Sequence, residues 1–105
     1  MNDFSYREID LIPDGWVIVK ISADRIFYKI LSNWNEFDEW RLSSGATTDT
    51  LRKIPAGYVW QQASGNTYML LSENEGKLSQ YNQLRLEGFL EYDEIETLKI
   101  EDVRV

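Results

Sequence analysis

The sequence predicts an α+β fold, with an antiparallel meander sheet or partial barrel of about six to seven strands and one helix at about residues 77–88. Short runs of β-branched and aromatic residues are separated by turn residues such as Gly, Pro, Asn and Asp, which is typical of consecutive strands. The hydrophobic period changes to that of a helix only over residues 77–88. With 105 residues, of which 43% are apolar, the chain fits a single domain, residues 1–105, with one core.

The first half of the chain contains three runs that read as strands. Residues 1–12 fit either a short leading strand or a helical turn, and "IPDG" (12–15) is a turn signal. "WVIVKI" (16–21) is apolar on both faces, so we expect a central strand that is covered on both sides. "IFYKIL" (26–31) is the second strand, and "FDEWRL" (37–42) alternates as a half-exposed third strand does.

The second half contains a short strand, a hairpin and a final strand. "LRKI" (51–54) leads to two strand-like runs, "YVWQQ" (58–62) and "TYMLL" (67–71). The intervening "ASGN" (63–66) holds a Ser-Gly-Asn turn signal, which predicts a hairpin. The charged, alternating segment at 94–105 predicts a last strand at a sheet edge, where charge discourages unwanted pairing.

The helix is predicted from "KLSQYNQLRLEG" (77–88). Leu78, Tyr81 and Leu84 recur every three residues and would form one apolar stripe against the sheet. Gly88 would then be the C′ residue that ends the helix.

The composition excludes several classes of function. The chain has no Cys and no His, so disulfides, thiolate metal sites and Ser-His-Asp or Cys-His catalysis are excluded. We therefore expect a protein that is not an enzyme and that needs no cofactor. A net charge of −7 disfavours direct nucleic-acid and membrane binding. No signal peptide or membrane-spanning run is recognisable, which predicts a cytoplasmic protein.

Aromatic residues make up 13% of the chain. The four tryptophans, Trp16, Trp34, Trp40 and Trp60, exceed what one short helix would cover. This surplus predicts a ligand surface or self-association as a homo-oligomer, although large aromatics in a small core would give the same composition.

The segment "WRLSSGATT" (40–48) is the strongest candidate for a binding site. A Gly-containing turn can direct backbone amides at an anion, hydroxyls add donors, and an Arg can bind phosphate or carboxylate through two hydrogen bonds. A hydroxyl-rich turn without any ligand is the alternative. The predicted ligand-binding residues are Trp34, Trp40, Arg41, Ser43, Ser44, Gly45 and Thr47.

Two acidic groups are further candidates. Glu36, Asp38 and Glu39 form a cluster before Trp40 that could contribute oxygen ligands, although edge protection explains it as well. A second group could imitate the phosphates of a nucleic acid and occupy a basic groove, or simply be a solvated surface. It consists of Glu87, Glu91, Asp93, Glu94, Glu96, Glu101 and Asp102.

Four stretches together resemble a family of short proteins encoded by tailed bacteriophages: "IPDGWVIVKI", "YKIL" followed by a nearby Trp, "WRLSSG" and "SGNTY". The resemblance covers roughly residues 12–90, and "WRLSSG" is its most specific part. The chain departs from the family where Glu36, Asp38 and Glu39 replace small and glycine-rich residues. The resemblance implies a phage accessory protein that acts in the cytoplasm of the bacterial host, where such proteins often counter host defence. It implies no particular activity.

Two functional hypotheses follow. The first is a non-catalytic counter-defence protein that binds and sequesters a small anionic, nucleotide-like ligand. The alternative is an acidic protein–protein inhibitor that mimics nucleic acid and blocks a basic host defence protein or nuclease.

Overall fold

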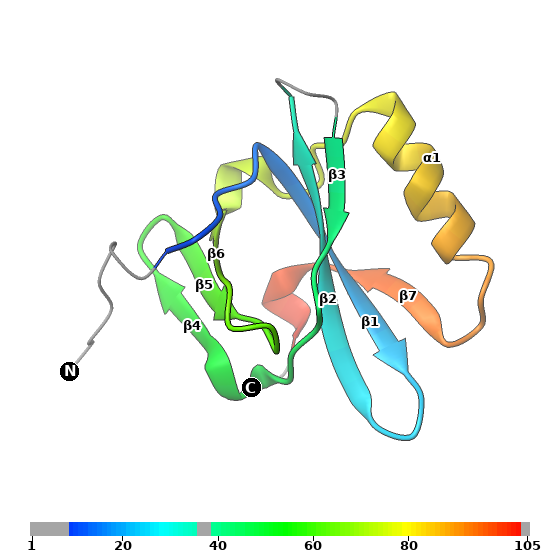
Figure 1. Cartoon of the computed structure of the whole chain (residues 1–105), viewed down its shortest axis with the longest axis horizontal. Coiled ribbons are helices and arrows are strands. Elements are labelled where there is room, and N and C mark those ends of the chain that lie inside the picture. The colour runs from blue at the N-terminus through cyan, green and yellow to red at the C-terminus, as the bar shows by residue number, and fades with distance from the viewer. Residues whose placement is uncertain (1–8, 36–38, 104–105) are drawn as a thin grey trace.

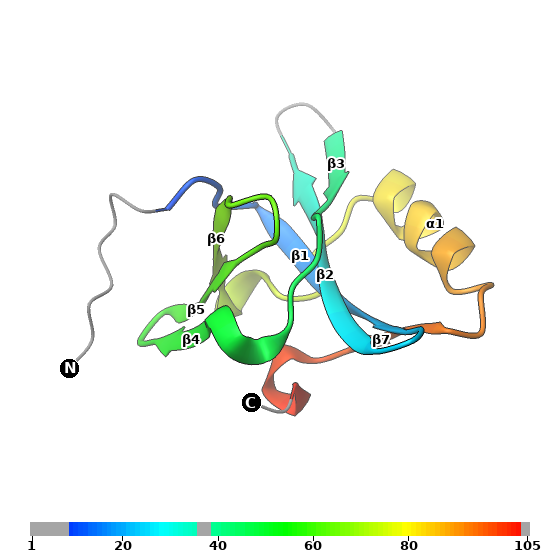
Figure 2. The same cartoon turned by 60° about the horizontal axis from the view of Figure 1, so that its bottom comes forward.

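A computed structural model describes residues 9–35 and 39–103. These residues form seven strands in two antiparallel sheets and one α-helix, which confirms the predicted fold class. Figures 1 and 2 show three layers: the helix α1 covers one face of the larger sheet, and the smaller sheet lies on the other side. The division of the strands into two sheets is the main feature that the sequence did not predict.

The larger sheet has four strands in the order β3-β2-β1-β7. β1 is central and β7 lies at the edge, as predicted. The apolar residues Trp16, Ile18 and Val19 of β1 are all buried, because the second sheet covers one face and α1 covers the other. The strands are β1 (Gly15–Ser22), β2 (Ile26–Trp34), β3 (Glu39–Leu42) and β7 (Ile95–Leu98).

The smaller sheet has three strands in the order β4-β5-β6. They are β4 (Leu51–Ile54), β5 (Gly57–Gln61) and β6 (Thr67–Leu71). β5 and β6 pair in register from Gln61↔Thr67 to Gly57↔Leu71, so the hairpin predicted at "ASGN" is confirmed.

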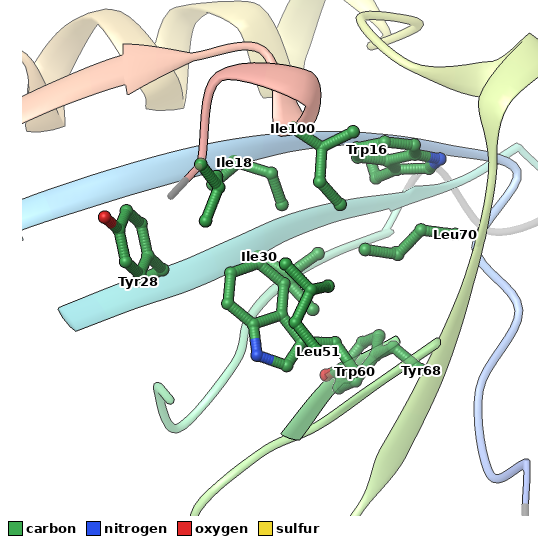
Figure 3. Packing of buried hydrophobic residues seen from close by; sticks show 10 residues of the cluster. Trp16, Ile18, Tyr28, Ile30, Leu51, Trp60, Tyr68, Leu70 and Ile100 are labelled. Carbon is green, nitrogen blue, oxygen red and sulfur yellow. The ribbon is translucent and has the colours of Figure 1, made fainter. Parts of the chain in front are cut away.

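The main core lies between the two sheets. Figure 3 shows large side chains from both sheets meeting there. Each of the two fully buried indoles has a partner for its N–H: Trp16 Nε1 donates to the Leu71 carbonyl at 2.9 Å and Trp60 Nε1 to the Thr47 carbonyl at 3.0 Å. These two hydrogen bonds therefore fix the orientation of the indole rings, in addition to the apolar contacts of the core. Its residues include Trp16, Ile18, Tyr28, Ile30, Leu51, Trp60, Tyr68, Leu70 and Ile100.

The helix differs from the prediction in its bounds and in its buried face. α1 runs over Gln80–Phe89, so Gly88 lies inside the helix and is not its C′ residue; the C-cap is Leu90. Tyr81 and Leu84, expected in the buried stripe, are 44% and 60% exposed.

A buried polar residue explains why hydrophobic periodicity predicted the wrong buried face of the helix. The face of α1 toward the sheet carries Asn82 and Leu86, and Asn82 occupies a place where the pattern requires an apolar residue. Asn33 of β2 accepts hydrogen bonds from Asn82 Nδ2 and, at 3.0 Å, from the backbone N–H of Ser79. Ser79 is also the N-cap, since its side chain accepts from the Asn82 N–H. A polar connection therefore sets the start of α1.

The C-terminal segment is also shorter as a strand than predicted. After β7 the chain forms a 3₁₀ turn at Ile100–Asp102. Ile100 and Val103 are buried in the main core, so the chain turns inward to close it and cannot continue along the sheet edge. In the first half, β2 extends to Trp34, beyond the predicted end of the second strand at residue 31.

The tryptophans find cover within the single chain. Trp16 and Trp60 are fully buried, while Trp34 and Trp40 are half-buried and pack against separate core clusters. Self-association stays a prediction, but the four indoles no longer require it. In the described part of the chain, no helix has the length and apolar character needed to span a bilayer.

Candidate functional site

The segment that follows β3 runs beside β2. The Ser43 N–H donates to the Ile30 carbonyl at 2.9 Å, and Ala46 exchanges two backbone hydrogen bonds of 2.8 Å with Tyr28. Between them Gly45 has a φ of +108°, and a Cβ there would lie 3.2 Å from Cδ2 of Phe27. The segment therefore bends at a position that favours glycine.

The β5–β6 hairpin holds the same segment from its other side. The Ala63 N–H donates to the Gly45 carbonyl at 2.8 Å, and the Ser64 N–H donates to Ser44 Oγ at 2.9 Å. The segment is thus tied to both sheets, and its position is set by pairings between residues that are distant in sequence.

A pocket of about 550 Å³ lies along this segment. Its volume is within the usual range of about 300–1,000 Å³ for small-molecule sites. The lining combines one cation, one carboxylate, an aromatic ring, hydroxyls and amides. These groups come from Arg25, Phe27, Ser44, Thr47, Asp49, Thr50, Gln61 and Gln62, with Gly45, Ala46 and Ala63 completing the wall.

Gln62 is the unusual member of this lining because it is only 3% exposed. Its Oε1 accepts from Ser43 Oγ at 2.6 Å, and that hydroxyl accepts from the Ile30 N–H at 2.8 Å. Within the described residues, Gln62 Nε2 is buried and has no hydrogen-bond partner. A buried amide donor of this kind costs about 1–3 kcal/mol, which a suitable acceptor would recover.

The structure divides the predicted ligand-binding residues among three places. Ser44, Gly45 and Thr47 line the pocket. Ser43 is buried beside it and holds Gln62. Trp40 packs on the helix side, with its ring 6.0 Å from that of Phe89. Trp34 and Arg41 form a third group, so the seven residues do not make one site.

Arg41 points away from Trp40, as alternation along the strand predicts, but it reaches neighbouring side chains and not the pocket lining. Its guanidinium lies 5.9 Å from the centre of the Trp34 ring. Burial raises the pKa of Tyr68, while the charge of Arg41 and its hydrogen bond to that side chain act in the opposite direction. Arg41 is exposed, and its side chain lies by Trp34 and Tyr68, outside the lining of this pocket.

The turn amides are also partly engaged. Ser43 and Ala46 donate their backbone N–H groups to carbonyls of β2. The predicted array of free amides is thus reduced, and side chains supply most of the identified donors of this pocket.

The structure describes the two groups of acidic candidate residues to different extents. Glu36 and Asp38 lie outside the described residues, and for Glu39 only the backbone is described. No group of residues suited to hold a metal occurs in the ranges 9–35 and 39–103. The acidic residues from Glu87 to Asp102 are all exposed, as their predicted surface role requires.

Sequence reasoning missed Arg25, Phe27 and Gln62. Arg25 directly precedes β2 and Phe27 is the second residue of that strand, so the two are close in sequence, and this spacing could have indicated a cation near a ring. Gln62 gave no local signal, since its importance depends on Ser43, which is 19 residues earlier.

Comparisons of the chain with protein-family models, curated proteins and solved structures find no match.

Proposed function

We propose that this protein is a non-catalytic binder that sequesters a small anionic, nucleotide-like ligand in the pocket beside residues 43–47. The observation that carries the proposal is the buried, unpartnered amide nitrogen of Gln62, a residue that lines a pocket with a cation and an aromatic ring. Ligand pockets typically combine apolar walls with a few polar groups of this kind.

Each part of a nucleotide has a chemically suitable partner in the pocket. The Arg25 guanidinium can bind a phosphate through two parallel hydrogen bonds. The Phe27 ring can stack on a base. The Asp49 carboxylate can accept hydrogen bonds from ribose hydroxyls, the role that an acidic residue has in dinucleotide sites.

The proposed role is binding without catalysis. The chain contains no His and no Cys, the residues most often used as base or thiol nucleophile near neutral pH. The lining of the pocket holds one carboxylate, Asp49, and general acid–base catalysis by a carboxylate pair needs two.

The biological setting is proposed from the family resemblance alone. "WRLSSG" and the three accompanying stretches support an accessory protein of a tailed bacteriophage that acts in the host cytoplasm. A binder there could counter host defence by removing a nucleotide signal from its receptor. Fold and resemblance suggest such a role by analogy and do not identify the signal.

Mass spectrometry of small molecules released from the purified protein, with light scattering on the same sample, tests this proposal. We expect a phosphate-containing ligand in a defined ratio to the protein, and light scattering will show whether the binder is a homo-oligomer. Titration calorimetry of the emptied protein with nucleoside 5′-monophosphates should then show saturable binding. If no phosphate-containing compound is released and no monophosphate binds, the proposal is wrong.

The alternative, an acidic inhibitor of a basic host protein, is favoured by one observation. Glu87, Glu91, Asp93 and Glu94 are exposed next to Leu84 and Tyr92, which are each 60% exposed. An apolar anchor inside an acidic rim suits a basic partner surface. Charge reversal of Glu87 and Glu91 would abolish such an interaction and leave nucleotide binding unchanged.

A further inference from the structure

The orientation of the Gln62 amide follows from the hydrogen atoms of Ser43. A hydroxyl has one proton and two lone pairs. Ser43 Oγ accepts from the Ile30 N–H at 2.8 Å and lies 2.6 Å from Gln62 Oε1, so its own proton is donated to that oxygen. Reversing the amide would leave this buried hydroxyl proton without an acceptor. Ser43 therefore holds Gln62 with its oxygen inward and leaves Nε2 as the free donor.

The residues along the pocket occur in a definite order. Ser43 pairs with Ile30 and Ala46 pairs with Tyr28, so the segment runs antiparallel to β2 toward Arg25. Gln62 lies at the Ser43 end through its hydrogen bond, and Gly45 lies in the middle, where an added Cβ would be 3.2 Å from the Phe27 ring. Arg25 is at the far end, directly before the first residue of β2. A ligand aligned with the pocket would place its phosphate near Arg25 and its base toward Gln62.

Burial decides which ligand group suits each end. Arg25 is exposed, so a phosphate bound there keeps part of its hydration. Gln62 is among the residues that line the pocket, but its Nε2 has almost no exposed surface, so an acceptor reaches that atom only if the lining shifts slightly. A neutral carbonyl oxygen can do this at a much lower desolvation cost than a phosphate can. An amino group at the same place would set donor against donor.

We propose that Gln62 determines which base is bound, and that it selects a base with a carbonyl oxygen over one with an amino group. The inference rests on the proposed nucleotide binding and adds its specificity. Ser43 is the positioning residue, since its hydroxyl binds Gln62 Oε1 and leaves Nε2 as the end of the amide that is free for an acceptor. Inosine and adenosine 5′-monophosphates make a matched pair of probes, because the purine carries a carbonyl oxygen in one and an amino group in the other.

The experiment is calorimetric titration of the intact protein with both probes. We expect inosine monophosphate to bind about 10-fold to 100-fold more tightly, the scale of one buried hydrogen bond. Gln62→Met keeps the length of the side chain and removes the donor, so the two affinities should become equal, mainly through loss of inosine monophosphate binding. Gln83→Met, on an exposed position of α1, is the matched control and should keep the preference.

Ser43→Ala is a second variant, at a residue that lies beside the pocket and does not contact the ligand. It removes the hydroxyl that orients Gln62, so the ratio of the two affinities should fall toward one even where both ligands still bind. Circular dichroism establishes that each variant is folded, and the comparison in the unmodified protein needs no variant.

The outcomes separate this inference from the proposed function. If neither nucleotide binds, both are wrong. If adenosine monophosphate binds as tightly as inosine monophosphate or more tightly, the carbonyl selection is wrong while nucleotide binding stands. If Gln62→Met weakens both ligands by the same factor, Gln62 only supports the pocket and the inference is overturned.

Discussion

Replacing Arg25 by alanine should weaken nucleotide binding without weakening the fold. Arg25 is exposed and lines the pocket. A charge-assisted hydrogen bond contributes about 1.5–3 kcal/mol, and an exposed guanidinium belongs at the lower end because water screens it. We therefore expect about a 10-fold loss of affinity. Since Arg25 is the proposed phosphate partner and that group is common to both ligands, inosine and adenosine monophosphates should lose the same factor.

Arg41→Ala is the matched control because it removes the same charge. Arg41 lies over the Trp34 ring and outside the pocket lining, so its loss should affect the fold more than the ligand. A cation–π contact of about 0.5–1 kcal/mol predicts a Tm lower by a few degrees.

The assay is calorimetric titration at low salt, with thermal melting of each variant measured in the same buffer. The reasoning predicts a loss of affinity for Arg25→Ala and a loss of stability for Arg41→Ala. If affinity is lost only in Arg41→Ala, the proposal that the nucleotide binds in this pocket is refuted. That result would favour a binding site around Trp34 and Arg41.

Three further predictions concern folding and pH. Gly45→Val should impair folding and nucleotide binding together, because φ is +108° and the new Cβ would lie 3.2 Å from Phe27; melting and titration measure the two effects. Gly88→Ala should stabilise the protein by about 0.5 kcal/mol in urea unfolding, because Gly88 lies within α1 and a Cβ there would meet nothing within 4 Å; a loss of stability would mean that Gly88 ends the helix after all. The raised pKa of Tyr68 means that the unfolded chain loses this proton first, so stability present below about pH 10 should decline as pH rises above it. Tyr68→Phe should reduce that decline, which melting between pH 9 and 11 would reveal.

The strands were predictable because their signals are local. "WVIVKI" is apolar on both faces, and β1 is buried on both faces. "ASGN" separates two alternating runs, and it forms the β5–β6 turn. The helix was located to within a few residues, but its buried face was wrong. Asn82 occupies a core position through its bond to Asn33, which is 49 residues away, and hydrophobic periodicity cannot indicate such a pairing.

The site was predictable only in its central segment. Ser44, Gly45 and Thr47 were selected for their types, and they line the pocket. Arg41 was selected because a guanidinium beside the turn can bind phosphate or carboxylate through two hydrogen bonds, yet its side chain lies over Trp34. Arg25, Phe27 and Gln62 join the segment through the pairings of Ala46 with Tyr28 and of Ala63 with Gly45. Sequence alone does not show pairings over such separations.

The most direct test of the binding pocket is an amide NMR titration of the ¹⁵N-labelled protein with inosine 5′-monophosphate. We predict saturable shifts of the backbone signals of residues 44–47 and Phe27 and of the side-chain NH₂ signal of Gln62, which would report a new hydrogen bond directly. Shifts centred on Trp34 and Arg41 or on residues 87–102, or no shifts at millimolar nucleotide, would contradict the account.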